Sequence, residues 1–547
     1  MKRTLVIQLG RLGDVIQTTP LLLELSEADP TSELDLLVVR PNEKALHGLR
    51  GISTIHTVGE DLKWLDDRIA AGFEGRAIPS EAREALHELR LPHYNRVINA
   101  SHAALGCWMT GQIPCETREG GVINDRGECL YEGGAHVYRI ALLGFREQNW
   151  FNLVDLLRCC APRVPRHRLP GLYAAKADRL PFALPQGRKV ALNPGASESH
   201  RRWPSEHFAR LAENLAAAGL CPILVGAPSD REACGTVQAG CKVTLLNYAG
   251  HTSIPEMARL LSEVELLISA DTGAVHVASA VGTRVLGLYG ASAYFSETAP
   301  WGEGHLILQS PLGTPVSGIE PELVIAAARQ RLGLLNEGTL RTELHRGKQA
   351  AWETQFLAAG TDPVGGLCYR PMQEEEPKAG DLFTRALRHA FALEFSGGAG
   401  DVSLEYAKDW WNLSANGENR ELDERATDLL QRTASVVQAL EDMMGAAEKC
   451  EELSKRTDEK TAAGIQSIAP LLMRSMEALR ALTQNAEPAA FKPVVHYLDW
   501  RLRMMAALPP AETFAHHLKE FRTAASLLCR AGSMLGELVL KKAPAVH

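Results

Sequence analysis

The sequence predicts an α/β protein with two doubly wound domains, followed by an all-α region. In the first part of the chain, short apolar runs alternate with amphipathic helical segments, which is the pattern of a parallel sheet covered on both faces. A second such series begins near Lys189, after the Pro-rich stretch Ala161–Pro185, which reads as a linker. From Asp401 onward only five of the 46 glycines remain, so turns between short elements become rare.

The first series predicts a domain over residues 1–165. A helical segment from Val15 to about Glu27 follows the first apolar run and the glycine-rich turn GRLGD. The predicted strands are Thr4–Leu9, Leu34–Val39 and Arg96–Asn99.

The second series predicts a domain over residues 166–335, of the same architecture. Its helices are expected at Ser205–Ala218, at Ile254–Leu261 and at His276–Val281. Its predicted strands are Val190–Asn193, Cys221–Val225, Leu266–Ser269 and Arg284–Tyr289.

The remaining chain is expected to form a transitional linker over residues 336–400 and a helical bundle over residues 401–547. The linker contains GTDPVGG and QEEEPKAG, which are typical of exposed loops. In the last region apolar residues such as Leu429, Val436 and Leu440 recur at helical spacing. Residues 1–335 are therefore expected to fold without the rest of the chain.

Composition excludes several classes of protein. The 547 residues carry a net charge of -8, with a pI near 6.2, which argues against a nucleic-acid-binding protein. No run approaches the roughly 18 apolar residues of a membrane-spanning helix, and the N-terminal apolar run is shorter than a signal peptide requires, so a cytoplasmic location is expected. The 11 cysteines match neither a disulfide framework nor a zinc template, so no metal site is expected.

Ligands of doubly wound sheets bind beyond the carboxyl ends of the strands, and the chain places its most distinctive loops there. The first loop, Gly10–Asp14, lies between a predicted strand and a helix. It matches neither the dinucleotide fingerprint nor the phosphate-binding P-loop. Asp14 stands at the start of the helix, where it could cap the helix or take part in chemistry in the cleft.

Two further loops indicate an anion site in the second domain. The loop that follows the strand Val190–Asn193 carries Gly195 and then two guanidinium groups, Arg201 and Arg202, which suit phosphate recognition. The segment from Asp271 to His276 joins a strand to a helix start, so backbone N–H groups and the helix dipole point toward a ligand.

Four segments together resemble glycosyltransferase family 9, the lipopolysaccharide heptosyltransferases. In chain order they are LGRLGDVIQTTP, NPGASESHRRWPSEHFARLA, VGAPSDREA and SADTGAVHVASAVGTRVLGLYGAS. The resemblance covers about residues 1–335. It implies a GT-B fold, in which two Rossmann-like domains face a common cleft, and an inverting, metal-independent transfer of heptose from an ADP-activated donor, with no bound cofactor.

The resemblance also implies roles for individual residues. Asp14 would be the general base, and Glu232 would approach the nucleotide ribose. Arg201 stands where the family usually has Lys, which keeps the charge but changes its geometry. The residues expected at the donor are Gly13, Asn193, Gly195, Arg201, Arg202, Glu232, Asp271, Thr272, Gly273 and His276. Those proposed for acceptor binding are Arg11, Arg40, His102 and Arg139.

The expected acceptor is a cell-surface glycan such as the lipopolysaccharide core, reached by peripheral contact with the inner membrane. A protein acceptor, such as a flagellin or an adhesin, is the alternative within the same family. A non-catalytic nucleotide-sugar-binding assembly protein and a GT-B epimerase acting on a UDP-sugar are further alternatives. The helical tail is expected to mediate oligomerisation, to dock a protein, or only to brace the other domains.

Overall fold

The computed structural model describes most of the first 372 residues. The described residues are 2–59, 67, 80–124, 127, 129–143, 146–149, 151–162, 171–291, 293–336, 340, 354–361 and 367–372. The chain divides into two compact units, of which the first joins Met1–Cys129 to Phe151–Glu375 and the second joins Leu130–Trp150 to Glu376–His547. The predicted helical bundle, 401–547, lies outside the described residues.

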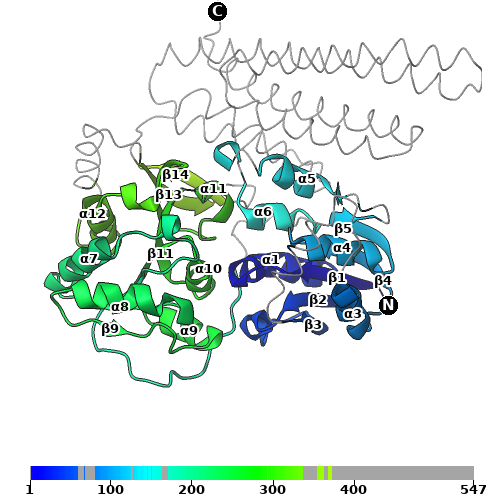
Figure 1. Ribbon diagram of the computed structural model, residues 1–547, viewed down its shortest axis with the longest axis horizontal. Helices are drawn as coiled ribbons and strands as arrows, with labels where there is room; N and C mark the ends of the chain where they lie inside the picture. The colour runs from blue at the N-terminus through cyan, green and yellow to red at the C-terminus, as the bar shows by residue number, and fades with distance from the viewer. Residues whose placement is uncertain are drawn as a thin grey trace, which may run out of the picture. The chain divides into compact units, whose positions relative to one another are not determined.

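A parallel sheet forms the N-terminal half of the first unit (Figure 1). Its strands are β1 (Arg3–Gln8), β2 (Glu33–Val39), β3 (Thr54–Val58), β4 (Tyr94–Asn99) and β5 (Cys115–Ile123). They pair in the order β3-β2-β1-β4-β5. Leu5 and Ile7 of β1 enter one buried cluster and Val6 enters another, so both faces of the central strand are covered.

The helices of this half follow the expected pattern, although α1 begins earlier than the sequence predicts. They are α1 (Leu12–Ala28), η1 (Asn42–Leu46), α3 (Ser80–Glu88), α4 (Ala104–Gln112) and α6 (Leu153–Arg158). Val15 of α1 packs in the core of the first sheet, whereas Ile16 joins a core cluster of the second. Helix α1 is therefore shared between the two sheets.

A buried ion pair fastens α6 to α1. The guanidinium of Arg158 donates through Nη2 to Oε1 of Glu24 at 2.8 Å, and both side chains are less than a tenth exposed. Arg158 also lies over the ring of Trp301, with 5.6 Å between Cζ and the ring centroid. The aromatic face and the carboxylate together stabilise a cation that has lost its water.

The second sheet has the order β14-β13-β12-β11-β10-β7-β8-β9. Its strands are β7 (Lys189–Asn193), β8 (Cys221–Leu224), β9 (Leu246–Asn247), β10 (Leu266–Ala270), β11 (Arg284–Ala291), β12 (Leu306–Leu312), β13 (Gln355–Thr361) and β14 (Leu367–Pro371). Its helical segments are η3 (Ser199–Arg201), α7 (Ser205–Ala217), η4 (Pro228–Asp230), α8 (Arg231–Gly240), α9 (Ile254–Leu261), α10 (Gly273–Ala280), α11 (Phe295–Thr298), η5 (Val316–Gly318) and α12 (Pro321–Arg331). The two doubly wound α/β sheets predicted from the sequence are confirmed.

The second sheet extends beyond residue 335. Strands β13 and β14 pair antiparallel with each other, and β13 pairs antiparallel with β12. Phe356 and Leu357 are buried on opposite faces of the sheet. This part of the range 336–400 is thus core rather than linker. The sequence did not indicate β13, because the loop-like segment GTDPVGG begins inside this strand, at Gly360.

In the second unit the described residues are few. They contain α5 (Gly134–Ala141) and η2 (Arg146–Gln148). Strand β6 (Cys129–Glu132) crosses the boundary, because its first residue belongs to the first unit and the rest to the second. Within the described ranges no helix has the length and apolarity needed to cross a membrane.

The burial of β13 generates a stability prediction. Replacing Phe356 by Ala removes a fully buried ring from the core and should lower the free energy of unfolding by about 3–5 kcal/mol. Its exposed neighbour Gln355 is the matched control, and Gln355→Ala should change stability by no more than about 0.5 kcal/mol. Chemical denaturation of the full chain measures both. Equal, small effects would mean that β13 is not part of the folded core.

Candidate functional site

The turn between β1 and α1 is tightly packed and requires glycine at its first position. Gly10 donates its N–H to Oε1 of the buried Gln8 at 3.0 Å, and its carbonyl accepts from Nδ2 of Asn42 at 3.2 Å. A Cβ at Gly10 would lie 2.6 Å from Oδ2 of Asp14. Gly10 therefore lets the chain turn within contact distance of the Asp14 carboxylate.

Asp14 lies in the first turn of α1 and caps it. Its Oδ2 accepts the backbone N–H of Arg11 at 2.8 Å, which satisfies a donor that the helix leaves unpaired. Its own carbonyl accepts from Oγ1 of Thr18 at 2.8 Å. Capping uses one carboxylate oxygen and fixes the rotamer of the side chain. The second oxygen is then held in a defined direction, so the capping role and a chemical role are compatible.

On the second sheet, the predicted loops meet at the carboxyl ends of β7 and β10. Asn193, at the end of β7, donates from Nδ2 to Oγ1 of Thr272 at 3.2 Å and accepts the N–H of Gly195 at 3.1 Å. The Thr272 hydroxyl also lies 3.0 Å from Oγ of Ser269. These bonds hold Thr272 in extended conformation at the N-cap of α10.

An ion pair between Arg201 and Asp271 lies beside this helix start. Nη2 of Arg201 contacts Oδ2 of Asp271, and each side chain is only about an eighth exposed, at 15% and 13%. Burial raises the pKa of Asp271 to about 6, while the positive charge of Arg201 opposes that rise. The two residues predicted from separate motifs are thus brought together.

The turn of α1 and the N-terminus of α10 pack against each other, which brings the two halves of the predicted site into one place (Figure 1). The Cα of Gly13 faces the imidazole of His276, since a Cβ there would lie 2.7 Å from Cδ2 of the ring. At Gly273 a Cβ would meet the backbone of Gly13 and the side chain of Leu12 at 3.8 Å. The charge of Asp14 acts on Asp271 and on His276.

His276 is buried and neutral at physiological pH. Its side chain is 4% exposed, and desolvation lowers its pKa to about 4, although the negative charge of Asp14 opposes that change. Among the described residues, its Nδ1 has no hydrogen-bond partner. A buried imidazole nitrogen that faces no protein partner is a group that a ligand could satisfy.

Two other predicted donor residues, Arg202 and Glu232, are exposed. Arg202 donates from Nε to the carbonyl of Ala196 at 2.9 Å, so it braces the loop that follows β7. Glu232 is exposed on the first turn of α8. Asp230, which the motif reasoning overlooked, packs against Gly195 and Gly226, where a Cβ would collide with its side chain. The glycines in these two loops mark that close approach.

The proposed acceptor residues belong to different elements of the chain. Arg11 donates from Nη1 to Oγ of Ser197 at 3.4 Å, so it reaches the loop of the second sheet. Arg40 donates to Oγ1 of Thr57 at 3.3 Å at the edge of the first sheet, and His102 is exposed beyond β4. Arg139 lies on α5, in the second unit. Their acceptor role stays a prediction.

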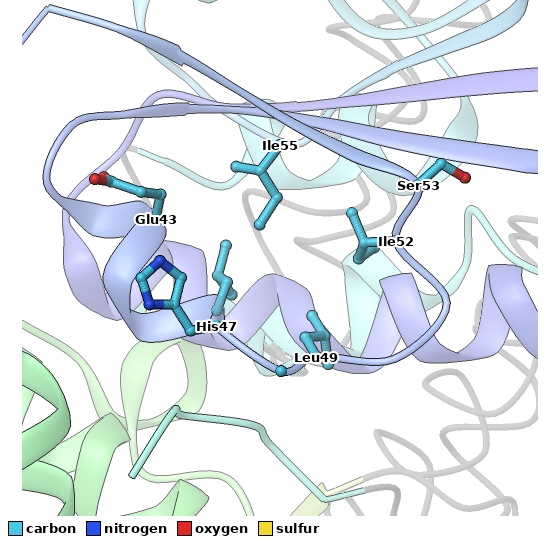
Figure 2. A pocket seen from close by; sticks show the side chains of 8 residues that line it. Glu43, His47, Leu49, Ile52, Ser53 and Ile55 are labelled. Carbon is cyan, nitrogen blue, oxygen red and sulfur yellow. The ribbon is translucent and has the colours of Figure 1, made fainter. Parts of the chain in front are cut away.

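A separate pocket of about 420 Å³ lies between η1 and β3 (Figure 2). Leucine and isoleucine side chains line it together with Glu43, His47 and Ser53. None of the residues predicted from the motifs lines it, so it does not belong to the site at α10. Within the described residues, no group of three or more His, Cys, Asp and Glu side chains is arranged to hold a metal ion.

Comparison with known families shows what the part of the chain that contains the second sheet resembles. Residues 170–316 match the model of glycosyltransferase family 9 (heptosyltransferase). Over these residues the chain is similar to glycosyltransferase family 9. The matched residues include every donor residue predicted from the second series of motifs, and the two sheets expected from the resemblance are confirmed over the described residues.

Individual relatives cover different shares of the chain. Lipopolysaccharide core heptosyltransferase OpsX of Haemophilus influenzae is 31% identical over 118 residues, which are 21% of this chain and 33% of the relative. Lipopolysaccharide heptosyltransferase 3 of Escherichia coli is 21% identical over 308 residues, 53% of this chain and 83% of the relative. The crystal structure of a family 9 glycosyltransferase from Veillonella parvula covers 60% of this chain and 97% of its own, at 20% identity and a TM-score of 0.48.

Contact between Gly13 and His276 can be tested with a mutant cycle. Gly13→Ala should lower the free energy of unfolding by about 1–3 kcal/mol, because the added methyl group overpacks the imidazole. In a His276→Ala background the same change should cost much less, since the ring is gone. Denaturant unfolding of the four proteins measures the coupling.

Gly235 supplies the control for this cycle. It lies within α8, and a Cβ there would meet nothing within 4 Å, so Gly235→Ala should stabilise by about 0.5–1 kcal/mol in either background. If Gly13→Ala costs the same with and without the His276 ring, the two helices do not meet at this contact.

Proposed function

We propose that this protein is an inverting glycosyltransferase that moves heptose, or a related sugar, from an ADP-activated donor to a cell-surface glycan such as the lipopolysaccharide core. The family-9 match and the relatives named as lipopolysaccharide heptosyltransferases support the class of reaction. One structural observation carries the proposal to individual residues. The turn that holds Asp14 packs on the start of α10, where Asp271, Thr272 and His276 gather.

Asp14 is the proposed general base. The acceptor hydroxyl must lose its proton as its oxygen attacks the anomeric carbon, and a carboxylate within hydrogen-bond reach can accept that proton. The bond from Asp14 to the N–H of Arg11 fixes the carboxylate before substrate arrives. Attack from the face opposite the leaving diphosphate inverts the configuration at the anomeric carbon.

The leaving nucleoside diphosphate is proposed to lie against the positive groups of the second sheet. As the glycosidic bond breaks, negative charge grows on the diphosphate. Arg201, Arg202 and the N-terminus of α10 offer positive charge and N–H donors at that place. The charge must come from the arginines and the helix, because burial keeps His276 neutral.

Asp271 is proposed to accept hydrogen bonds from the donor sugar while Arg201 balances its charge. Glu232, exposed on α8, is proposed to approach the nucleotide ribose. Arg11 and Arg40 are proposed on the acceptor side, with His102 and Arg139. A glycolipid acceptor would bring the protein to the cytoplasmic face of the inner membrane, and the helical tail is proposed to serve assembly or docking there.

Thermal stabilisation by nucleotides tests the donor. ADP should raise the melting temperature more than UDP, GDP or CDP. At a free ADP concentration of 100 times Kd, binding should stabilise the folded state by about 2.7 kcal/mol. Arg201→Ala should reduce the ADP effect because a diphosphate partner is lost. Arg210→Ala is the matched control, since Arg210 is an exposed arginine on α7 paired with Glu322. A preference for UDP would instead favour an epimerase or another donor sugar.

Replacement of Asp14 by Asn tests the base. The amide oxygen can still accept the N–H of Arg11, so the cap and the fold should survive. The turnover number should fall roughly 10²–10⁴-fold, while ADP still stabilises the protein. Asp29→Asn, at the other end of α1, is the control and should retain full turnover. Turnover of Asp14→Asn close to that of the unmodified protein would remove Asp14 as the base.

A further inference from the structure

Gln8 is a buried amide at the end of β1, two residues before the turn that leads to Asp14. Its side chain is 1% exposed, and an amide removed from water needs protein partners for both its oxygen and its nitrogen. Oε1 accepts the N–H of Gly10 at 3.0 Å, and Nε2 donates to Oγ1 of Thr18 at 3.0 Å. The amide therefore bridges the first residue of the turn and helix α1.

Thr18 extends this bridge to Asp14 itself. Its hydroxyl has one hydrogen, which it donates to the backbone carbonyl of Asp14 at 2.8 Å. The hydrogen is available because Nε2 of Gln8 can only donate, so the hydroxyl accepts on that side. Thr18 is also 1% exposed, which gives water little access to these groups. The hydrogen bonds thus run in one direction from Gln8 through Thr18 to Asp14.

The amide of Gln8 also lies close to the Asp14 carboxylate. A Cβ at Gly10 would be 2.6 Å from Oδ2 of Asp14 and 2.8 Å from Oε1 of Gln8, so the two oxygens flank the same point. Nε2 of Gln8 donates as well to the carbonyl of Ala100 at 3.4 Å, just beyond the end of β4. Gln8 therefore ties the Asp14 turn to the neighbouring strands β1 and β4.

We propose that Gln8 is a positioning residue for Asp14, acting through Gly10 at the start of the turn and through Thr18 on α1. This inference rests on the proposed function, in which Asp14 takes the proton of the acceptor hydroxyl. A base works only when its oxygen lies within hydrogen-bond reach of that proton, and a displacement of about 1 Å can cost a factor of about 100 in rate. Gln8 itself is buried and does not touch the substrate.

The position requires a side chain that both donates and accepts. A glutamate carboxylate could accept from Gly10 but could not donate to Thr18, and methionine, which has a similar length, offers only a weak acceptor. Gln8→Met therefore removes the hydrogen bonds of the amide and keeps most of its packing. Thr18→Val breaks the link to the Asp14 carbonyl, whereas Thr18→Ser retains the hydroxyl that makes it.

The experiment measures kcat and donor KM in the full-length protein, with ADP-heptose as donor, a heptose-deficient lipopolysaccharide core as acceptor and ADP release as the readout. Gln8→Met should lower kcat roughly 10–100-fold. It should leave the donor KM and the thermal stabilisation by ADP unchanged, because the proposed phosphate-binding groups belong to the second sheet. Thr18→Val should lower kcat in the same way, and Thr18→Ser should restore it.

A double-mutant comparison separates positioning from a general loss of structure. When Gln8→Met is added to Asp14→Asn, the residual turnover should not fall further, because Gln8 acts through the carboxylate that is already missing. A purely structural role would lower turnover by the same factor in both backgrounds.

Thr19→Val is the matched control on the same helix. It removes a fully buried hydroxyl that donates to the carbonyl of Ile16 at 2.7 Å and accepts the N–H of Tyr173 at 2.9 Å. Thr19→Val should therefore lower the melting temperature without changing kcat.

Three results would overturn the proposal. One is a Gln8→Met protein that loses stability but keeps its turnover, and another is an equal loss of turnover with and without the Asp14 carboxylate. If Gln8→Met does not fold, the Thr18 variants decide, and equal turnover of Thr18→Val and Thr18→Ser is the third. An unmodified protein that releases no ADP instead overturns the proposed function, and this inference with it.

Discussion

The close approach of α1 to the start of α10 is the constraint on which the candidate site depends. Gly13 has no Cβ, and its Cα packs directly against the ring of His276. This close packing brings the turn that carries Asp14 near enough for the Asp14 charge to act on Asp271. Ile16 continues the same contact into the core of the second sheet. Because packed interiors tolerate little extra volume, one methyl group at Gly13 is enough to disturb the meeting of two sheets.

The predictable parts of this fold are those whose signal is local. Apolar runs bounded by turn residues located β1 and β10, and helical periodicity located α9 over Ile254–Leu261. Strand β5, CETREGGVI, escaped prediction because its first half is polar, and β13 escaped because its apolar run lies within a loop-like region. Their strand character depends on partners elsewhere in the chain.

The candidate site also contains residues that the sequence pattern marks and residues that only the fold brings together. Asp14, Asp271 and His276 stand at strand ends beside glycine, so sequence pattern alone marks them. Asp230 carries no such mark, since its close approach to Gly195 and Gly226 arises from the packing of two loops. The Arg201–Asp271 pair lies between these cases, because both residues belong to motifs but their contact is a product of the fold.

The late position of β13 and β14 also has a consequence for biosynthesis. Strand β12 pairs with β11 on one edge and with β13 on the other, and more than 40 residues separate β12 from β13. While the ribosome is still making that intervening segment, β12 presents an open, largely apolar edge (LILQSPL) to other chains. Nascent chains that stall there expose this edge, which favours aggregation and creates a need for chaperones.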